Sequence, residues 1–147
     1  MKKHPLLLAV AFGLASTVLA QKEEKEEKNV TPPAAVKAAF NKAYPAATKT
    51  TWEKEDGNYE AGFTDKGQKM AAVYSPAGAL QETEVSIPVA SLPAAVTDYM
   101  KQHYKGITVK EASKITKADG TTNYEAEIHK KDVVFDAKGN FIKEEKD

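Results

Sequence analysis

Two stretches of the chain carry apolar residues at the spacing of a single helix face. Residues 31–45 and 91–105 each contain the sequence PAAV, followed by larger apolar side chains at every fourth position. The apolar positions are Val36, Phe40 and Tyr44 in the first stretch, and Val96, Met100 and Tyr104 in the second. An i, i+4, i+8 pattern forms one stripe along an amphipathic helix. The sequence therefore predicts two helices of this kind.

Both predicted helices have start and stop residues at their ends. Thr31 and Ser91 are hydroxyl residues of the type that caps a helix N-terminus, and a proline follows each within the first turn, where its missing N–H does little harm. Pro45 and Gly106 stand where the helical patterns end, and both residue types interrupt helices. We expect Thr31 and Ser91 to cap the two helices.

Four short stretches follow each predicted helix, with turn residues between them. They span 48–55, 59–64, 69–75 and 79–87 after the first helix, and 108–117, 123–130, 132–136 and 141–145 after the second. The Gly, Asn and Asp residues between them accept the positive φ of tight hairpins. Closely spaced hairpins join neighbouring antiparallel strands. The predicted fold class is α+β, in which one helix and a four-stranded antiparallel meander occur twice.

Alternation along these strands indicates which side of the sheet is covered. Tyr59, Ala61 and Phe63 would point to one side, and Glu60 to the other. The same alternation recurs in the second set of strands. An antiparallel sheet with one covered face and one solvated face gives this pattern, so we expect both helices to lie on the apolar face.

The two halves of the chain also share short sequence motifs. NYEAGF at 58–63 returns as NYEAEI at 123–128, and AVYSPAGAL parallels VVFDAKGNF. Several independent features in the same order indicate an internal duplication. We place repeat 1 at about 30–87 and repeat 2 at about 88–147. The two repeats would form one domain with a single curved sheet.

The N-terminal segment has the layout of a secretory signal peptide. Lys2 and Lys3 precede a short apolar centre, and small residues lead to Ala20. We predict cleavage after Ala20, export to the periplasm or the medium, and no membrane attachment afterwards. Residues 21–29 are a charged run that we interpret as a flexible spacer. The chain has no cysteine, which excludes disulfides and a lipid-bearing cysteine.

Charge and motifs narrow the function classes. The chain has 21 basic and 21 acidic residues, whereas a nucleic-acid binder needs a basic surface. It contains no HExxH, GxSxG or phosphate-binding glycine motif. The histidines are His4, His103 and His129, and a zinc site needs three or four convergent ligands. We predict no enzymatic activity, no cofactor and no metal site.

Taken together, these features resemble the PepSY-like family, whose members are also described as β-lactamase-inhibitor-like. The resemblance rests on the signal peptide, the PAAV helices, the Tyr-Glu-Ala strands and the glycine in the last hairpin, and it covers residues 30–146. It implies a tandem α+β fold whose curved sheet can present a surface to another protein. It also implies a place in the bacterial envelope or outside the cell, and relatives in fold that inhibit β-lactamases.

Four residues are candidates for a binding surface. Trp52 is the only tryptophan, and it could either anchor a partner or pack in the core. Tyr74 is a weaker candidate of the same type. Glu60 and Glu125 occupy equivalent strand positions, so they could approach each other across the sheet. Alternatively, they keep the solvated face soluble.

The function that these observations favour is an exported, non-enzymatic protein-binding module. Its partner would be another protein, and inhibition of an envelope or secreted hydrolase is one form that such binding could take. The alternative is a periplasmic binder of a small ligand or peptide in the concavity of the sheet. A protein partner predicts an exposed apolar patch around Trp52 or Tyr74 on the helix-free side, whereas a small ligand predicts an enclosed pocket. The sequence leaves the oligomeric state open.

Overall fold

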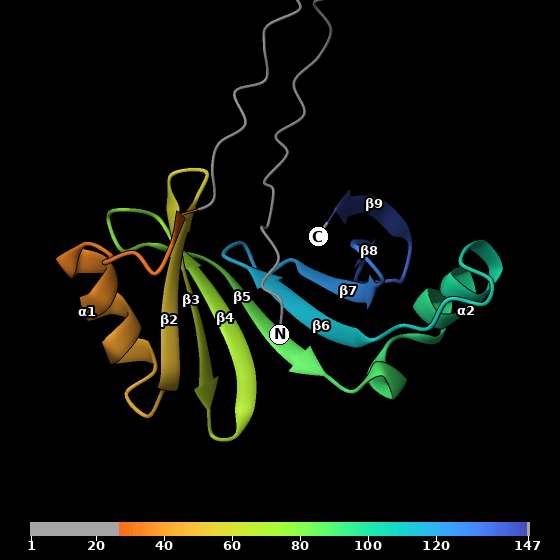
Figure 1. The fold of residues 1–147 in the computed structure, drawn as a ribbon, viewed down its shortest axis with the longest axis horizontal. Helices are drawn as coiled ribbons and strands as arrows, with labels where there is room; N and C mark the ends of the chain where they lie inside the picture. Colours follow the sequence, from red (N-terminus) through yellow and green to blue (C-terminus); the bar gives the residue numbers. More distant parts are fainter. Residues whose placement is uncertain (1–26, 147) are drawn as a thin grey trace, which may run out of the picture.

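The structure, a computed structural model, describes residues 27–146 and shows an α+β fold with one antiparallel sheet. The elements are β1 (Glu27–Lys28), α1 (Ala34–Ala43), β2 (Thr48–Glu55), β3 (Asn58–Asp65), β4 (Gln68–Tyr74), β5 (Leu80–Ile87), a short 3-10 turn (Val89–Ser91), α2 (Ala94–His103), β6 (Glu111–Lys117), β7 (Thr122–Ile128), β8 (Lys131–Asp136) and β9 (Phe141–Lys146). All nine strands lie in chain order in the sheet, and each pairs antiparallel with the next (Figure 1). The predicted signal peptide, residues 1–20, lies outside the described residues.

The strands agree closely with the predicted stretches, and the sheet also extends into the predicted spacer. Glu27 and Lys28 form β1 and pair with Lys54 and Glu53 of β2. The prediction that residues 21–29 form a flexible spacer is therefore wrong for these two residues. The prediction rested on the lack of anchoring apolar side chains in the charged run. An edge strand, however, offers free backbone N–H and C=O groups to any neighbouring segment.

The helices form where the apolar stripe predicts them, but they begin differently. The N-terminal boundary residues are Pro33 and Pro93, and neither helix start has a side-chain cap. Thr31 and Ser91 thus lie too far upstream to cap the helices. Proline suits these positions because its φ is already close to the helical value and it has no N–H to leave unpaired.

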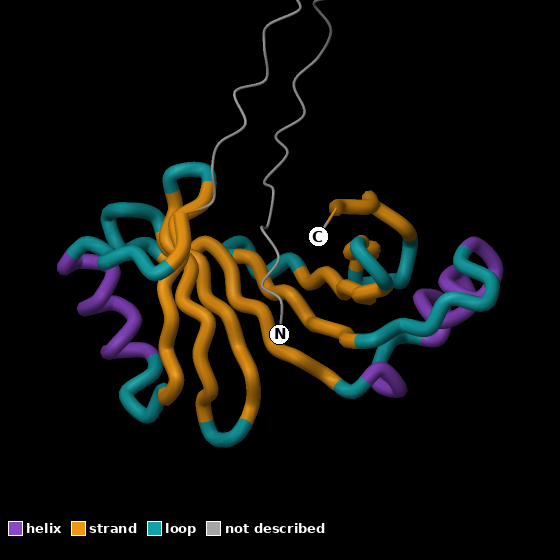
Figure 2. The backbone as a smooth tube through the Cα atoms, viewed as in Figure 1, coloured by secondary structure: helices purple, strands orange, loops and turns teal. Residues whose placement is uncertain are grey.

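Each helix packs against the strands that follow it, so the molecule contains two separate cores. Val36 and Phe40 of α1 lie among buried residues of β3 and β4 such as Ala61. Val96 and Met100 of α2 pack against Ala112, Ala126, Ile128, Val133 and Phe135. Figure 2 shows the two helices at opposite ends of the molecule, with the sheet running between them.

Two turn glycines bring the last hairpin of each half beneath its own helix. Gly78 and Gly139 both have a φ of +85°. A Cβ on Gly78 would lie 2.7 Å from the carbonyl oxygen of Ala35, and a Cβ on Gly139 would lie 2.7 Å from Cβ of Ala95. Both contacts are too close for any side chain, so only glycine lets these hairpins reach the first turn of the helix.

The strand register places both helices on the same face of the sheet. Ala61 of β3 and Ala72 of β4 are partners and contact α1, while Ala112 of β6 and Ala126 of β7 are partners and contact α2. The intervening pairs keep these four alanines on one side, because residues opposite each other in a sheet point the same way. We call the other side, which carries Glu60, Ala71, Glu82, Ile115 and Glu125, the helix-free face.

Candidate functional site

Trp52 and Tyr74 lie on the helix-covered side of the sheet. Trp52 is the register partner of Ala61, and its ring meets the Phe40 ring edge-on, at 5.2 Å between centroids and 74° between planes. Tyr74 is only 2% exposed. The expectation of an apolar patch around these two residues on the helix-free face is therefore wrong. The reason is strand parity, since both residues share the side of Ala61 and Ala72.

Tyr74 is a core residue with an unusual feature. Within the described residues its phenolic oxygen is buried and makes no hydrogen bond. Burial raises the pKa of Tyr74 to about 12, and the neighbouring Tyr44 adds to the increase. The side chain therefore fills the first core at the expense of an unsatisfied hydroxyl group.

Glu60 and Glu125 do lie on the helix-free face, but they belong to different parts of it. Glu60 on β3 and Glu125 on β7 are separated by three intervening strands. Glu125 is 4% exposed, so the interpretation that it solubilises an open face is wrong. Burial is the main reason that the pKa of Glu125 lies well above its usual range. The nearby carboxylates of Glu84, Asp132, Glu145 and Glu127 raise it further.

The helix-free face is covered in one half of the sheet and open in the other. Ile115 of β6 and Val134 of β8 point to this face, where they are 1% and 2% exposed and belong to neither core. No described helix lies on this side of the sheet. The side chains bury one another because strands β6 to β9 curve towards this face (Figure 1).

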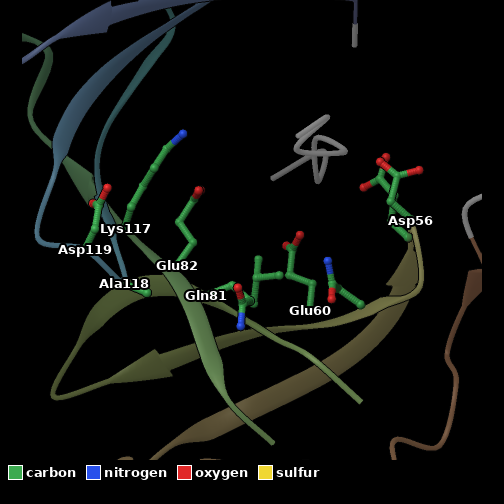
Figure 3. Close-up of a pocket in the computed structure, with 10 residues that line it drawn as sticks. Asp56, Glu60, Gln81, Glu82, Lys117, Ala118 and Asp119 are labelled. Atoms are coloured by element: carbon green, nitrogen blue, oxygen red, sulfur yellow. The ribbon is translucent and has the colours of Figure 1, made fainter. Parts of the chain in front are cut away.

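A pocket of about 240 Å³ opens where the two halves of this face meet. The β2–β3 turn, the start of β3, the end of β4, the start of β5, the end of β6 and the β6–β7 turn surround it. Its charged lining consists of five carboxylates and one ammonium group, from Glu55, Asp56, Glu60, Glu82, Asp119 and Lys117. Figure 3 shows Glu82 and Glu60 pointing into the hollow, with Asp56 on its far side.

The floor of the pocket follows one row across the sheet. Glu60, Val73, Glu82 and Lys117 are successive register partners on β3, β4, β5 and β6. Their side chains share the helix-free face because paired residues point the same way. The row brings residues distant in sequence into one line, and it crosses the junction between the two halves.

Glu82 is the most unusual group in this row. It is 4% exposed although it lines the pocket. Burial raises the pKa of Glu82 to about 7, against the opposing effect of Lys117 and Lys143 and with the help of Glu84 and Glu145. Among the described residues, no group donates a hydrogen bond to its carboxylate. Such a group gains much from a cationic partner.

Glu82 does not stand out in the sequence, because the pattern of residues around it is ordinary. Strand β5 reads LQETEVSI, in which polar and charged residues occupy both sides. Only the register with Val73 on one side and Lys117 on the other puts Glu82 in the row with Glu60. The signal that could have found it is the alignment of predicted strands across the junction.

The described part of the chain shows no sign of metal chemistry or of a membrane span. Between residues 27 and 146, no three His, Cys, Asp or Glu side chains are grouped so that they could hold a metal ion. No helix in that range is long and apolar enough to cross a membrane. The pocket described above combines apolar lining from Val73 and Ala118 with carboxylates that can accept hydrogen bonds.

The fold is similar to that of several solved bacterial structures. A "putative periplasmic" protein from Bacteroides eggerthii is 18% identical with a TM-score of 0.70, covering 80% of this chain and 90% of the other. A BLIP-like protein from Bacteroides fragilis is 24% identical with a TM-score of 0.61, at 80% and 87% coverage. A DUF2874 family protein from Bacteroides uniformis is 19% identical with a TM-score of 0.69, at 79% and 90% coverage.

The sequence itself matches a family model over most of its length. None of the curated proteins matches the sequence at a significant level. The family model matches residues 21–82 and 57–143, the second match overlapping the first. On these grounds the chain belongs to the family described as "Putative beta-lactamase-inhibitor-like, PepSY-like".

Proposed function

We propose that this protein is an exported, non-enzymatic binding module that holds another protein against the helix-free face of its sheet. The observation that carries the proposal is the acidic pocket on this face, with Glu82 buried at its floor. A sheet paired along all nine strands is a rigid support, and a rigid surface loses little conformational entropy on binding. Polar groups that must be matched in charge also reject the wrong partners.

In one form of this proposal, the bound protein is an envelope or secreted hydrolase, and binding inhibits it. The family description and the BLIP-like name of the Bacteroides fragilis structure support it. Export to the periplasm or the medium, with cleavage after Ala20, is part of the same proposal. The signal-like residues 1–20 support it, and so does the name of the Bacteroides eggerthii protein.

The proposed surface has its origin in a tandem duplication of one helix-plus-meander unit. Gly78 beneath Ala35 and Gly139 beneath Ala95 support this origin, because the same close contact occurs at the same place in both halves. Two copies joined edge to edge create a junction that a single copy lacks. The pocket lies at this junction, so the binding site is a product of joining the copies.

A second candidate function is the binding of a small cationic ligand or a peptide in the concavity. The pocket volume of about 240 Å³ favours it, although that volume is below the range of roughly 300–1,000 Å³ that is common for small-molecule sites. The pocket is also only partly enclosed. These two features make the pocket better suited to one side chain of a larger partner.

Affinity capture from the native periplasm or culture fluid tests the proposed function. Ala71→Arg places a long cationic side chain in the middle of the helix-free face, between Gly62 and Glu84. Ala38→Arg adds the same side chain to the exposed surface of α1. We expect the wild type and Ala38→Arg to capture the same protein in near-stoichiometric amounts, and Ala71→Arg to lose it.

The emission of Trp52 shows whether both variants are folded. Val73→Arg, also on the helix-free face, replaces Ala71→Arg if the latter unfolds. Equal capture by a folded face variant and the wild type would contradict the proposal.

A further inference from the structure

The lining of the pocket on the helix-free face carries more acidic than basic side chains. Its lining includes five carboxylates and a single ammonium group, that of Lys117. Asp56 and Asp119 are exposed, whereas Glu82 at the floor is buried. The charge thus extends from solvent down to a desolvated group. That arrangement attracts a cation to the mouth of the pocket and binds it most strongly at the floor.

Glu82 is the second and independent indication of a ligand. It is 96% buried, since 4% of its surface is exposed, and it points into the pocket (Figure 3). No hydrogen bond reaches its carboxylate from the described residues. Burying an acidic group without a donor is costly. A donor that enters the pocket would recover that cost, and a charged donor makes the stronger hydrogen bond.

We propose that the pocket takes the ammonium or guanidinium group of one lysine or arginine side chain that the bound protein presents, with the Glu82 carboxylate as its main hydrogen-bond acceptor. The proposal rests on the proposed function and names the chemical group that the helix-free face recognises. Glu60, which is separated from Glu82 in the row by Val73, lines the same pocket with a second carboxylate.

The shape of the pocket favours an organic cation over a metal ion. Hard metal ions need about six oxygen ligands at short distance, and no such grouping exists among residues 27–146. The pocket also has apolar lining from Val73 and Ala118. A lysine or arginine carries a hydrocarbon stem behind its charge, so Val73 and Ala118 would contact the stem while the carboxylates bind the head.

Binding of a cation would be linked to a proton. Burial raises the pKa of Glu82 to about 7, so near neutral pH a part of the molecules carries a neutral Glu82. A bound ammonium group favours the ionised carboxylate and expels this proton. The titratable groups around the pocket and Glu82 are Glu55 (β2), Asp56 (β2–β3 turn), Glu60 (β3), Glu84 (β5), Lys117 (β6), Asp119 (β6–β7 turn), and Lys143 and Glu145 (β9). Affinity should therefore rise as the pH increases through about 7.

An NMR titration with Nα-acetyl-lysine methylamide tests this inference. The probe carries the lysine side chain without a partner protein. We expect saturable shifts confined to the backbone amides around Glu82, Lys117 and the β2–β3 turn, and none with the uncharged Nα-acetyl-norleucine methylamide. Affinity should be several-fold higher at about pH 8 than at about pH 6, because Glu82 then stays ionised.

Two matched variants identify the acceptor. Glu82→Gln removes the floor carboxylate and should weaken probe binding by at least about tenfold, the size expected from one charge-assisted hydrogen bond. Glu127→Gln removes a carboxylate from the same face outside the pocket, and should bind the probe like the wild type. Equal weakening in both variants, or none in either, would overturn the inference.

The failure of this inference differs from the failure of the proposed function. If Glu82→Gln binds the probe as tightly as the wild type while Ala71→Arg still loses the captured protein, then the face binds a protein but not through a cation at Glu82. If the probe binds as described but Ala71→Arg captures the same protein as the wild type, the protein docks elsewhere. The proposed function is then contradicted.

Discussion

Glu82 on β5 and Lys117 on β6 are register partners across the strand pair that joins the two halves of the sheet. Lys117 lowers the pKa of Glu82, but burial outweighs it and raises that pKa to about 7. The junction therefore holds a carboxyl group that costs the fold stability when it is ionised. A site that destabilises its own fold is typical of surfaces shaped for binding.

Replacing Glu82 with glutamine should stabilise the protein at high pH. Below about pH 4.5 the carboxyl group is protonated in both states, so the variant and the wild type should be equally stable. As the pH rises towards 7, the unfolded chain releases this proton first, and the wild type loses stability. The variant cannot titrate, so it should be more stable by on the order of 1–2 kcal/mol at about pH 8, allowing for solvent screening in the open pocket.

Urea unfolding at a series of pH values measures this difference. Glu127→Gln is the matched control, because it removes a carboxylate from the same face outside the pocket. The pH-dependent gain in stability should be larger for Glu82→Gln than for this control. A stability difference for Glu82→Gln that is the same at low and high pH would contradict the raised pKa.

The two turn glycines should be equally intolerant of a side chain. Gly78→Ala and Gly139→Ala each combine a φ of +85° with a contact of 2.7 Å at the new Cβ. We expect each to cost about 2–4 kcal/mol, whereas Gly57→Ala should cost only about 1–2 kcal/mol, since it has a positive φ but open space around it. Chemical unfolding curves measure all three. Equal losses at Gly57 and Gly139 would show that the contact with the helix is unimportant.

The sequence alone predicted the fold well because local patterns determine it. The alternation at Tyr59, Ala61 and Phe63 predicted which face of the sheet is covered. The i, i+4 stripe through Val36 and Phe40 predicted the position of the first helix and its buried side. Both patterns report burial directly, and turn glycines mark the ends of the strands between them. The family resemblance seen in the sequence is also confirmed by the match of the family model.

The candidate site was less predictable because it depends on curvature and register. Trp52 and Tyr74 are surface candidates by residue type, yet the pairing of Trp52 with Ala61 and the position of Tyr74 two residues after Ala72 put both on the helix side. The burial of Glu125 could not be read from its strand, since it results from the bending of β6 to β9. Glu82 went unnoticed because its neighbours in the site lie on other strands.

Trp52 should matter for stability and not for binding. Its ring packs edge-on against Phe40 beneath α1, and the side chain is partly buried. Trp52→Ala should therefore cost about 2 kcal/mol, less than a fully buried aromatic residue. The variant should capture the same protein as the wild type, in the same amount, at a temperature where it is folded. Loss of the captured protein by folded Trp52→Ala would place the binding surface near α1 instead.

Removing the hydroxyl group of Tyr74 should not harm the fold. Its buried oxygen makes no hydrogen bond within the described residues, so Tyr74→Phe removes an unsatisfied polar atom and keeps the ring. We expect a gain of about 1 kcal/mol in the free energy of unfolding. Tyr59→Phe, at a partly buried position beside the same core, should change stability very little. Thermal and urea unfolding of the two variants give the comparison, and a large loss in Tyr74→Phe would reveal a partner for its oxygen.

The most direct test of the account is a crystal structure of the protein grown with saturating Nα-acetyl-lysine methylamide at about pH 8. The account predicts the probe in the pocket between β5 and the β2–β3 turn, with its ammonium nitrogen about 2.8 Å from a Glu82 carboxylate oxygen. An empty pocket with the probe bound on another surface, or with Glu82 satisfied by a group of the protein itself, would contradict it.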